Sequence, residues 1–208
     1  MRACCALAGG AALTAAWLGP LPPLAADLFA AYSAAHVAVI CVVTPLLAVA
    51  VAGSRFDPVK RWPRGFSPLA AALIEMLVVW GWHAPAIFAL REASALAALQ
   101  QASFAAAGLV LWLSVLGGDG ETRYERAGVG IIALLLTSMH MTLLGVLAMI
   151  SAPLFSGAVD VAASMEDQRL GGLLILAGAG IIYLIAGLVL LAWLLRPGAD
   201  VSRARRPA

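Results

Sequence analysis

Three histidines, His36, His83 and His140, are the side chains of this sequence best placed for chemistry, because each lies inside a run of apolar residues. A polar group in apolar surroundings is costly unless it has a partner. Neutral imidazole is a ligand for copper, among other transition metals. The sequence contains no HExxH motif, no CxxC motif and no glycine-rich phosphate loop that would indicate a different chemistry. The three histidines are therefore the candidate metal ligands.

Three methionines near these histidines, Met76, Met139 and Met141, are candidate soft ligands, because thioethers favour Cu(I). Neighbouring residues on a helix point about 100° apart, so Met139 and Met141 diverge from His140 and cannot join it at one ion. Met76 would share a face with His83, about 10 Å deeper. Packing is the alternative role of the methionines. A metal site must therefore combine residues from different helices.

The composition predicts an all-α, polytopic transmembrane helix bundle. The 208-residue chain is 63% hydrophobic and only 12% charged, against roughly half and a quarter in soluble domains. Several apolar runs reach the ~20 residues that a helix needs to cross a bilayer. The net charge of +2 gives no support for nucleic-acid binding. Cys4, Cys5 and Cys41 build no disulfide framework, and Cys41, on a different face from His36, is expected to be inert.

Five clear membrane spans are predicted, at residues 31–52, 68–90, 95–116, 128–151 and 170–195. They form a five-helix bundle over residues 27–195, which a basic tail follows at 196–208. Residues 1–26 combine a basic start with a short apolar stretch, which fits either a weak N-terminal membrane helix or a signal peptide. The helix is favoured, because Leu24 is a poor residue at position −3 of a cleavage site.

Lys and Arg residues are concentrated in alternate segments between the spans. Two loops and the tail carry Arg55, Lys60, Arg61 and Arg64, then Arg123 and Arg126, then Arg196, Arg203, Arg205 and Arg206. The segments between them carry only Arg91 and Arg169. Positive residues mark the cytoplasmic side of a membrane protein. The predicted C-terminus is therefore cytoplasmic.

On this topology the polar residues inside the spans gather in the outer half of the membrane. His36 and His83 lie a few residues below the outer ends of their spans, and His140 lies near the midplane. The other polar residues of this half are Tyr32, one turn above His36, Gln100 and Gln101 at the start of the third span, and the outer loop residues Asp160, Glu166, Asp167 and Gln168. Tyr32, Gln101, Asp167 and Gln168, together with Glu75, are the candidate supporting residues of the site. Such residues normally face the bundle interior, so we expect them to face one another. A hydrogen bond to a neighbouring helix is the alternative role for any one histidine.

Glu75 is a carboxyl group inside the second span, expected to be protonated or paired. A small transporter with Glu75 in its transport path is therefore an alternative function, although the spans lack the paired broken helices that are typical of transporters. His36 and His83, at similar depth on different spans, also suit bis-imidazole ligation in a heme-b-type membrane electron carrier or quinone-linked oxidoreductase. A hydrolase is not supported, because Ser138 and His140 do not face each other on a helix.

Five segments, in order and at matching spacing, resemble the CtaG-type cytochrome c oxidase assembly factors of bacterial respiratory chains. The resemblance runs from about residue 28 to 195, through "YSAAHVAVICVVTPLL", "VVWGWHAPAIF", "LQQASFAAAGLVLWLSVLGG", "LLLTSMHMTLLGVL" and "MEDQRLGGLLILAGAGIIYL". The chain departs from the family pattern at Tyr32, where the family often has histidine, at Gln100-Gln101, where many members have Glu-His, and at Ile175-Leu176, where Met-Trp is usual.

The resemblance implies a non-enzymatic assembly factor of the bacterial inner membrane that assists copper delivery or insertion at the periplasmic side. On this resemblance, His36, His83 and His140 match polar positions of the family and are the possible ligands of Cu(I). Asp167 and Gln168 would order the outer loop above them. The implied partners are the lipid bilayer and cytochrome c oxidase subunits, and a periplasmic copper carrier is a further candidate.

Overall fold

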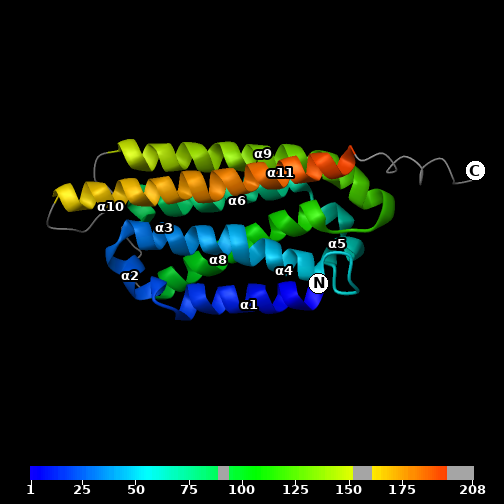
Figure 1. The fold of residues 1–208 in the computed structure, drawn as a ribbon, viewed down its shortest axis with the longest axis horizontal. Helices are drawn as coiled ribbons and strands as arrows, with labels where there is room; N and C mark the ends of the chain where they lie inside the picture. Colours follow the sequence, from blue (N-terminus) through cyan, green and yellow to red (C-terminus); the bar gives the residue numbers. More distant parts are fainter. Residues whose placement is uncertain (89–93, 152–160, 196–208) are drawn as a thin grey trace, which may run out of the picture.

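The computed structural model describes residues 1–88, 94–151 and 161–195, and this part of the chain is helical with no strand (Figure 1). The principal helices run side by side along the long axis of the molecule. They are α1 (Arg2–Leu18), α3 (Phe29–Ala38), α4 (Thr44–Val51), α6 (Pro68–His83), α8 (Ser94–Leu116), α9 (Gly120–Ile150), α10 (Val161–Leu174) and α11 (Ile181–Leu194). The shorter α2 (Leu21–Asp27) crosses one end of the bundle between α1 and α3. Short turns α5 (Pro58–Arg61), η2 (Pro63–Gly65) and α7 (Pro85–Phe88) lie between them.

Two of the rods contain a wider, π-helical turn. The segment η1 (Val39–Val43) joins α3 to α4, and η4 (Ile175–Gly180) joins α10 to α11. A π-turn inserts one extra residue into a helix and releases backbone carbonyls from their usual partners, which is why such turns often occur at functional sites. The two π-turns contact each other in the centre of the bundle.

The surface of the bundle is apolar, as a lipid-facing surface must be. Leu73 is 52% exposed, Ile132 53% and Leu188 53%, and each lies on a different long helix. A soluble monomer rarely exposes so much contiguous apolar surface. Polar residues such as His36, Glu75 and Gln168 are instead buried inside the bundle, together with apolar side chains. The described fold is therefore that of a helical membrane protein.

Four helices of the described residues are long and apolar enough to cross a membrane, at Phe29–Val51, Ala95–Leu116, Arg123–Ile150 and Ala162–Leu194. The predicted count of five spans plus an N-terminal one is therefore not confirmed. Arg2–Leu18 and Pro68–His83 are shorter apolar helices. The second predicted span, 68–90, stops early because Pro85 forces Ala84 out of the helical region, to a ψ of 130°. The remaining 16-residue helix is only about 24 Å long at 1.5 Å per residue.

The last predicted span, 170–195, begins later in the sequence than the helix that the structure shows. The helix already starts at Val161, so Glu166, Asp167 and Gln168 are helical and do not belong to a loop. Asp160, the other residue of that predicted loop, lies outside the described residues. At 1.5 Å per residue the 33-residue rod is about 50 Å long, well beyond the ~30 Å apolar core of a bilayer. Its polar first turns can therefore project past the membrane and still be helical.

The N-terminal segment forms a helix that packs against α4 and η1. A Cβ atom on Gly9 would lie 2.9 Å from Leu47 Cδ2, so glycine permits this close approach. At the start of the helix, Arg2 Nη2 donates a hydrogen bond to the Ala52 carbonyl at 3.0 Å. Residues 2–18 thus occupy a defined place beside the second half of the first long rod.

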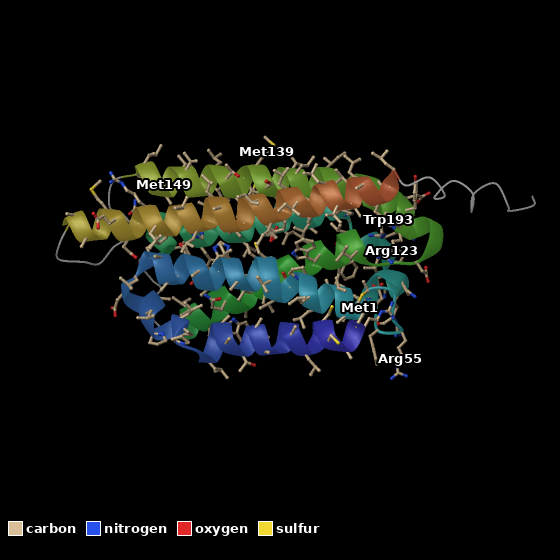
Figure 2. The ribbon with its side chains drawn as sticks, in the orientation of Figure 1. Met1, Arg55, Arg123, Met139, Met149 and Trp193 are labelled. Carbon is tan, nitrogen blue, oxygen red and sulfur yellow. The ribbon has the colours of Figure 1, made fainter. Side chains whose placement is uncertain are left out.

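The basic loops meet at one end of the bundle, where Figure 2 labels Met1, Arg55, Arg123 and Trp193. Asp57 joins these loops by accepting hydrogen bonds from three backbone N–H groups: Gly53 at 2.7 Å, Val59 at 2.9 Å and Gly118 at 2.9 Å. Gly53 and Gly118 have φ angles of 70° and 86°, a region that favours glycine. The two basic loops predicted from the sequence are therefore close neighbours in space, and the basic tail at 196–208 lies outside the described residues.

Candidate functional site: a buried pair of imidazoles

His36 on α3 and His83 at the end of α6 form a buried pair. Their ring centroids are 5.2 Å apart, with 46° between the ring planes. His36 is 0% exposed and His83 is 4% exposed. The pairing arises because both helices bring their histidine to the same depth, facing inward. The expectation that the polar residues of different spans face one another holds for these two.

Aromatic rings hold the imidazoles on several sides. Phe104 on α8 stacks on His36 with centroids 4.4 Å apart, and Phe29 meets His83 edge-on at 6.3 Å. The Tyr32 ring lies 5.4 Å from His83 and 6.5 Å from His36. Close packing of this kind limits the rotamers open to the two imidazoles. The pair is therefore preorganised.

The ring nitrogens of the pair are poised to accept a ligand. His83 Nδ1 lies 2.7 Å from the carbonyl oxygen of Val79, so in the neutral ring Nδ1 carries the proton and donates it. The lone pair is then on Nε2, which is buried and has no hydrogen-bond partner. Both ring nitrogens of His36 are likewise buried and unpartnered. A histidine that donates one N–H to a backbone carbonyl and keeps the other nitrogen free is the usual arrangement of a metal ligand.

His140 on α9 is a neighbour of the pair. Its imidazole interacts electrostatically with that of His36, and both of its ring nitrogens are buried without a hydrogen-bond partner. Within the described residues, however, no three or more His, Cys, Asp or Glu side chains are close enough together to hold one metal ion. The arrangement is a two-imidazole pair with a third imidazole nearby.

A cavity of about 870 Å³ is lined by residues from the end of α1, from α2, from α3 and from the start of α8. Tyr32 lines the cavity and has its ring centroid 5.4 Å from that of His83, and its hydroxyl accepts a hydrogen bond from Gln100 Nε2 at 3.0 Å. Gln101 also lines the cavity, and its Oε1 atom is buried without a partner. Tyr32 and Gln100, two of the positions that depart from the family pattern, are thus bonded to each other. The lining comprises Ala16, Trp17, Leu18, Pro22, Ala25, Asp27, Tyr32, Ala35, Ala97, Ala98, Gln100, Gln101 and Ala102.

Asp167 and Gln168 bind the ends of two helices. Asp167 accepts hydrogen bonds from the backbone N–H groups of Phe29 at 2.6 Å and Ala30 at 3.1 Å. These are two of the unpaired donors at the start of α3, the helix that carries His36. Gln168 Nε2 donates to the carbonyls of Ala148 and Ser151 at the end of α9, at 2.8 and 3.1 Å. Both residues stabilise helix ends around the pair from within α10.

Replacing Asp167 by alanine is expected to lower the free energy of unfolding by about 1–2 kcal/mol, because α3 loses the acceptor for two N–H groups and a favourable charge at its N-terminus. The midpoint of denaturant unfolding in detergent measures the loss. Glu166→Ala removes an exposed carboxylate from the preceding position and serves as the matched control. Equal stability of the two variants would contradict the capping role.

The three methionines differ in their exposure. Met139 is 68% exposed and points away from the bundle in Figure 2, whereas Met141 is fully buried. Met76 is half-buried on α6. Met139 and Met141 therefore diverge on the helix, as the helical geometry predicts.

A second polar cluster surrounds Glu75, deeper in the bundle. Tyr183 on α11 donates its hydroxyl to Glu75 Oε1 at 2.5 Å and stacks on Trp112 with centroids 5.5 Å apart. The Ile40 carbonyl, inside the π-turn η1, accepts from Trp112 Nε1 at 3.0 Å and from Thr44 Oγ1 at 2.8 Å. Sequence reasoning singled out Glu75 but missed Tyr183 and Phe104. Their only signal was an aromatic residue on an apolar helix, which packing explains equally well.

The pair does not fit a heme. Bis-imidazole ligation places the iron and its macrocycle between the two rings, with each nitrogen roughly 2 Å from the metal. Here the ring centroids are 5.2 Å apart, and Phe104, Tyr32 and Phe29 pack around the gap. These packed rings leave no slot for a macrocycle, so the pair does not suit the heme-b-type electron carrier that the sequence left open.

Together, the lipid-compatible surface, the four long apolar helices and the buried polar centre define a multi-pass helical membrane protein. Comparison of sequences then identifies its family. The model of the cytochrome c oxidase caa3 assembly factor family (Caa3_CtaG) matches residues 1–197, and the chain belongs to this family. The comparisons with curated proteins and with solved structures gave no match. The resemblance drawn from the sequence is thereby confirmed, and the family is one of assembly factors, which suggests a non-catalytic role.

Proposed function

We propose that this protein assists the assembly of cytochrome c oxidase by receiving Cu(I) on His36 and His83 and passing it toward an oxidase subunit at the periplasmic side of the bacterial inner membrane. The observation that carries the proposal is the buried pair with its unpartnered ring nitrogens. Imidazole suits copper, and Cu(I), a closed-shell ion, is satisfied by two nitrogen ligands. A two-ligand site also releases its ion more readily than a four-ligand site, which suits a cargo.

The side of the membrane follows from charge. The basic loops lie at one end of the bundle (Figure 2), and α6 begins next to them at Pro68 and ends at His83, so His83 lies at the far end of this helix. Because positive residues favour the cytoplasm, the C-terminus is proposed to be cytoplasmic and the cavity beside Tyr32 to open toward the periplasm. The cavity, of about 870 Å³ and lined by Tyr32, is the proposed place where a periplasmic copper carrier approaches. His140 offers the neighbouring imidazole for transfer of the ion.

Oxidase maturation in cells tests the proposal. In a strain lacking this protein, the wild-type chain is expected to restore the copper content and activity of cytochrome c oxidase, whereas the His36→Ala/His83→Ala variant is expected to leave both at the level of the deletion strain. The reason is the loss of both ligands. Metal analysis of the purified oxidase and oxygen consumption are the measurements.

Met139→Ala, which removes an exposed thioether from the lipid-facing surface, is the control and is expected to restore full activity. Immunoblots establish equal amounts of each variant in the membrane. Full restoration by the double histidine variant at equal abundance would show that the pair is not the site.

A further inference from the structure

Glu75 is a buried carboxyl group with no positive partner among the described residues. It is 0% exposed, Oε1 accepts the Tyr183 hydroxyl at 2.5 Å, and Oε2 has no hydrogen-bond partner. The ionisable groups that interact with it are the Cys41 thiol and the Tyr183 phenol, neither of which is a cation. A carboxylate without a counter-charge is very costly inside a membrane. With the imidazole pair empty, Glu75 is therefore the neutral acid.

The helices packed against α6 bring no closer positive charge. Within its described length α8 carries no titratable residue, and α9 carries His140 in the bundle and its other titratable residues only near the basic end. The other buried acidic residue in the described structure, Asp57, lies at the basic end and is satisfied by three backbone N–H groups. Glu75 is thus the acidic group of the bundle interior that can respond to a charge.

Cu(I) bound to the pair would introduce such a charge, because both imidazoles are neutral and contribute none. Glu75 and His83 lie on the same buried face of α6, together with Pro68, Ala71, Ala72 and Val79. They are eight residues apart, or about 12 Å along the helix axis. At an effective dielectric constant of about 20, a charge at that distance favours the carboxylate over the acid by about tenfold.

We infer that Glu75 is the proton-exchange group for the cargo: it releases its proton as Cu(I) enters the imidazole pair and takes a proton back as the ion leaves. The inference rests on the proposed function. When the Glu75 O–H bond breaks, the proton goes to bulk water and no electron is transferred, so the carboxylate that forms offsets part of the charge that the ion brings. Tyr183, held by its stacking on Trp112, donates to the carboxylate that forms.

The pH dependence of Cu(I) affinity tests the inference. The affinity of wild type divided by that of Glu75→Gln, measured with the same chromophoric Cu(I) competitor, is expected to rise from about 1 at low pH to about 10 at high pH. Because Cu(I) binding favours the Glu75 carboxylate by only about tenfold, at most about half a proton is released for each ion bound. This maximum falls at the pH where the affinity ratio is halfway through its rise. Glu125→Gln, an exposed substitution of the same kind on α9, should behave as wild type.

Tyr183→Phe provides a second measurement, which decides the matter if Glu75→Gln does not fold. This variant retains the Glu75 carboxyl group but removes the hydroxyl that donates a hydrogen bond to its carboxylate form. The rise of Cu(I) affinity with pH should therefore occur at higher pH than in wild type. Two results would overturn the inference. One is a ratio of wild-type to Glu75→Gln affinity that does not change with pH, and the other is a Cu(I) affinity of Tyr183→Phe with the same pH dependence as that of wild type. Failure of wild type to bind Cu(I) at all would overturn the proposed function instead, so the two failures are distinguishable.

Discussion

Replacing His83 by alanine is expected to lower the affinity for Cu(I) by at least about a hundredfold. Loss of a hydrogen-bond partner behind a metal ligand already costs about 10–100-fold, and loss of the ligand itself costs more. Here one of only two imidazoles would remain to hold the ion. His36→Ala should have an effect of the same size, because its ring faces that of His83 at 5.2 Å. Competition with a chromophoric Cu(I) chelator, on protein purified in detergent, measures both losses.

The neighbouring substitutions sharpen this experiment. His140→Ala is expected to leave the stoichiometry unchanged and to reduce the affinity less, because His140 lies near the pair without forming a three-ligand group with it. Met139→Ala, on the exposed face of α9, is expected to have no effect. If His36→Ala and His83→Ala both keep wild-type affinity, the paired imidazoles are not the ligands.

Replacing Gly145 by alanine is expected to destabilise the bundle by about 2–3 kcal/mol, because α9 and the α10–η4 rod touch through their backbones at this point. A Cβ atom on Gly145 would lie 2.6 Å from the Gly172 carbonyl oxygen and 2.7 Å from the Leu176 nitrogen. A Cβ atom on Gly172 would lie 2.6 Å from the Gly145 carbonyl oxygen. Backbone atoms cannot rotate away as a side chain can, so the two helices must separate.

Gly128 on the same helix supplies the matched control, because nothing lies within 4 Å of a Cβ atom built there. Gly128→Ala should be neutral or stabilise by up to ~1 kcal/mol, through the higher helix propensity of alanine. The midpoints of denaturant unfolding in mixed micelles compare the variants. Equal stability of Gly145→Ala and Gly128→Ala would mean that α9 and α10 do not approach this closely in the folded protein.

Much of the fold could be predicted from composition and periodicity, because a bilayer leaves a polytopic chain little choice but helices. The errors lay at the ends of helices. The span at 68–90 stops at His83 because of Pro85, a signal that was present in the sequence and was outweighed by the long apolar run. The last span starts at Val161 because a helix can continue through polar residues once it leaves the membrane.

The sequence predicted how deep the residues of the candidate site lie in the membrane, but not which way their side chains point. The positions of His36 and His83 along their spans placed them at similar depth, and the structure adds that they face each other between Phe104 and Tyr32. Gln100, not Gln101, bonds Tyr32, although the two are adjacent in the sequence. A change of one residue rotates a side chain by about 100°, and only the packing of neighbouring helices selects the rotation.

By itself, the sequence determined the class of this protein, its family and which polar side chains enter the membrane, because these depend on residue type and order along the chain. The tertiary structure alone decided which of those side chains meet. The two π-turns illustrate this: Ile40 lies in η1 and Tyr183 follows η4, and the Tyr183 hydroxyl lies within hydrogen-bond distance of both the Ile40 carbonyl and Glu75. A π-turn adds one residue to a helical rod and so turns the residues after it. No apolar pattern encodes such a turn, since both helices remain equally apolar with and without it.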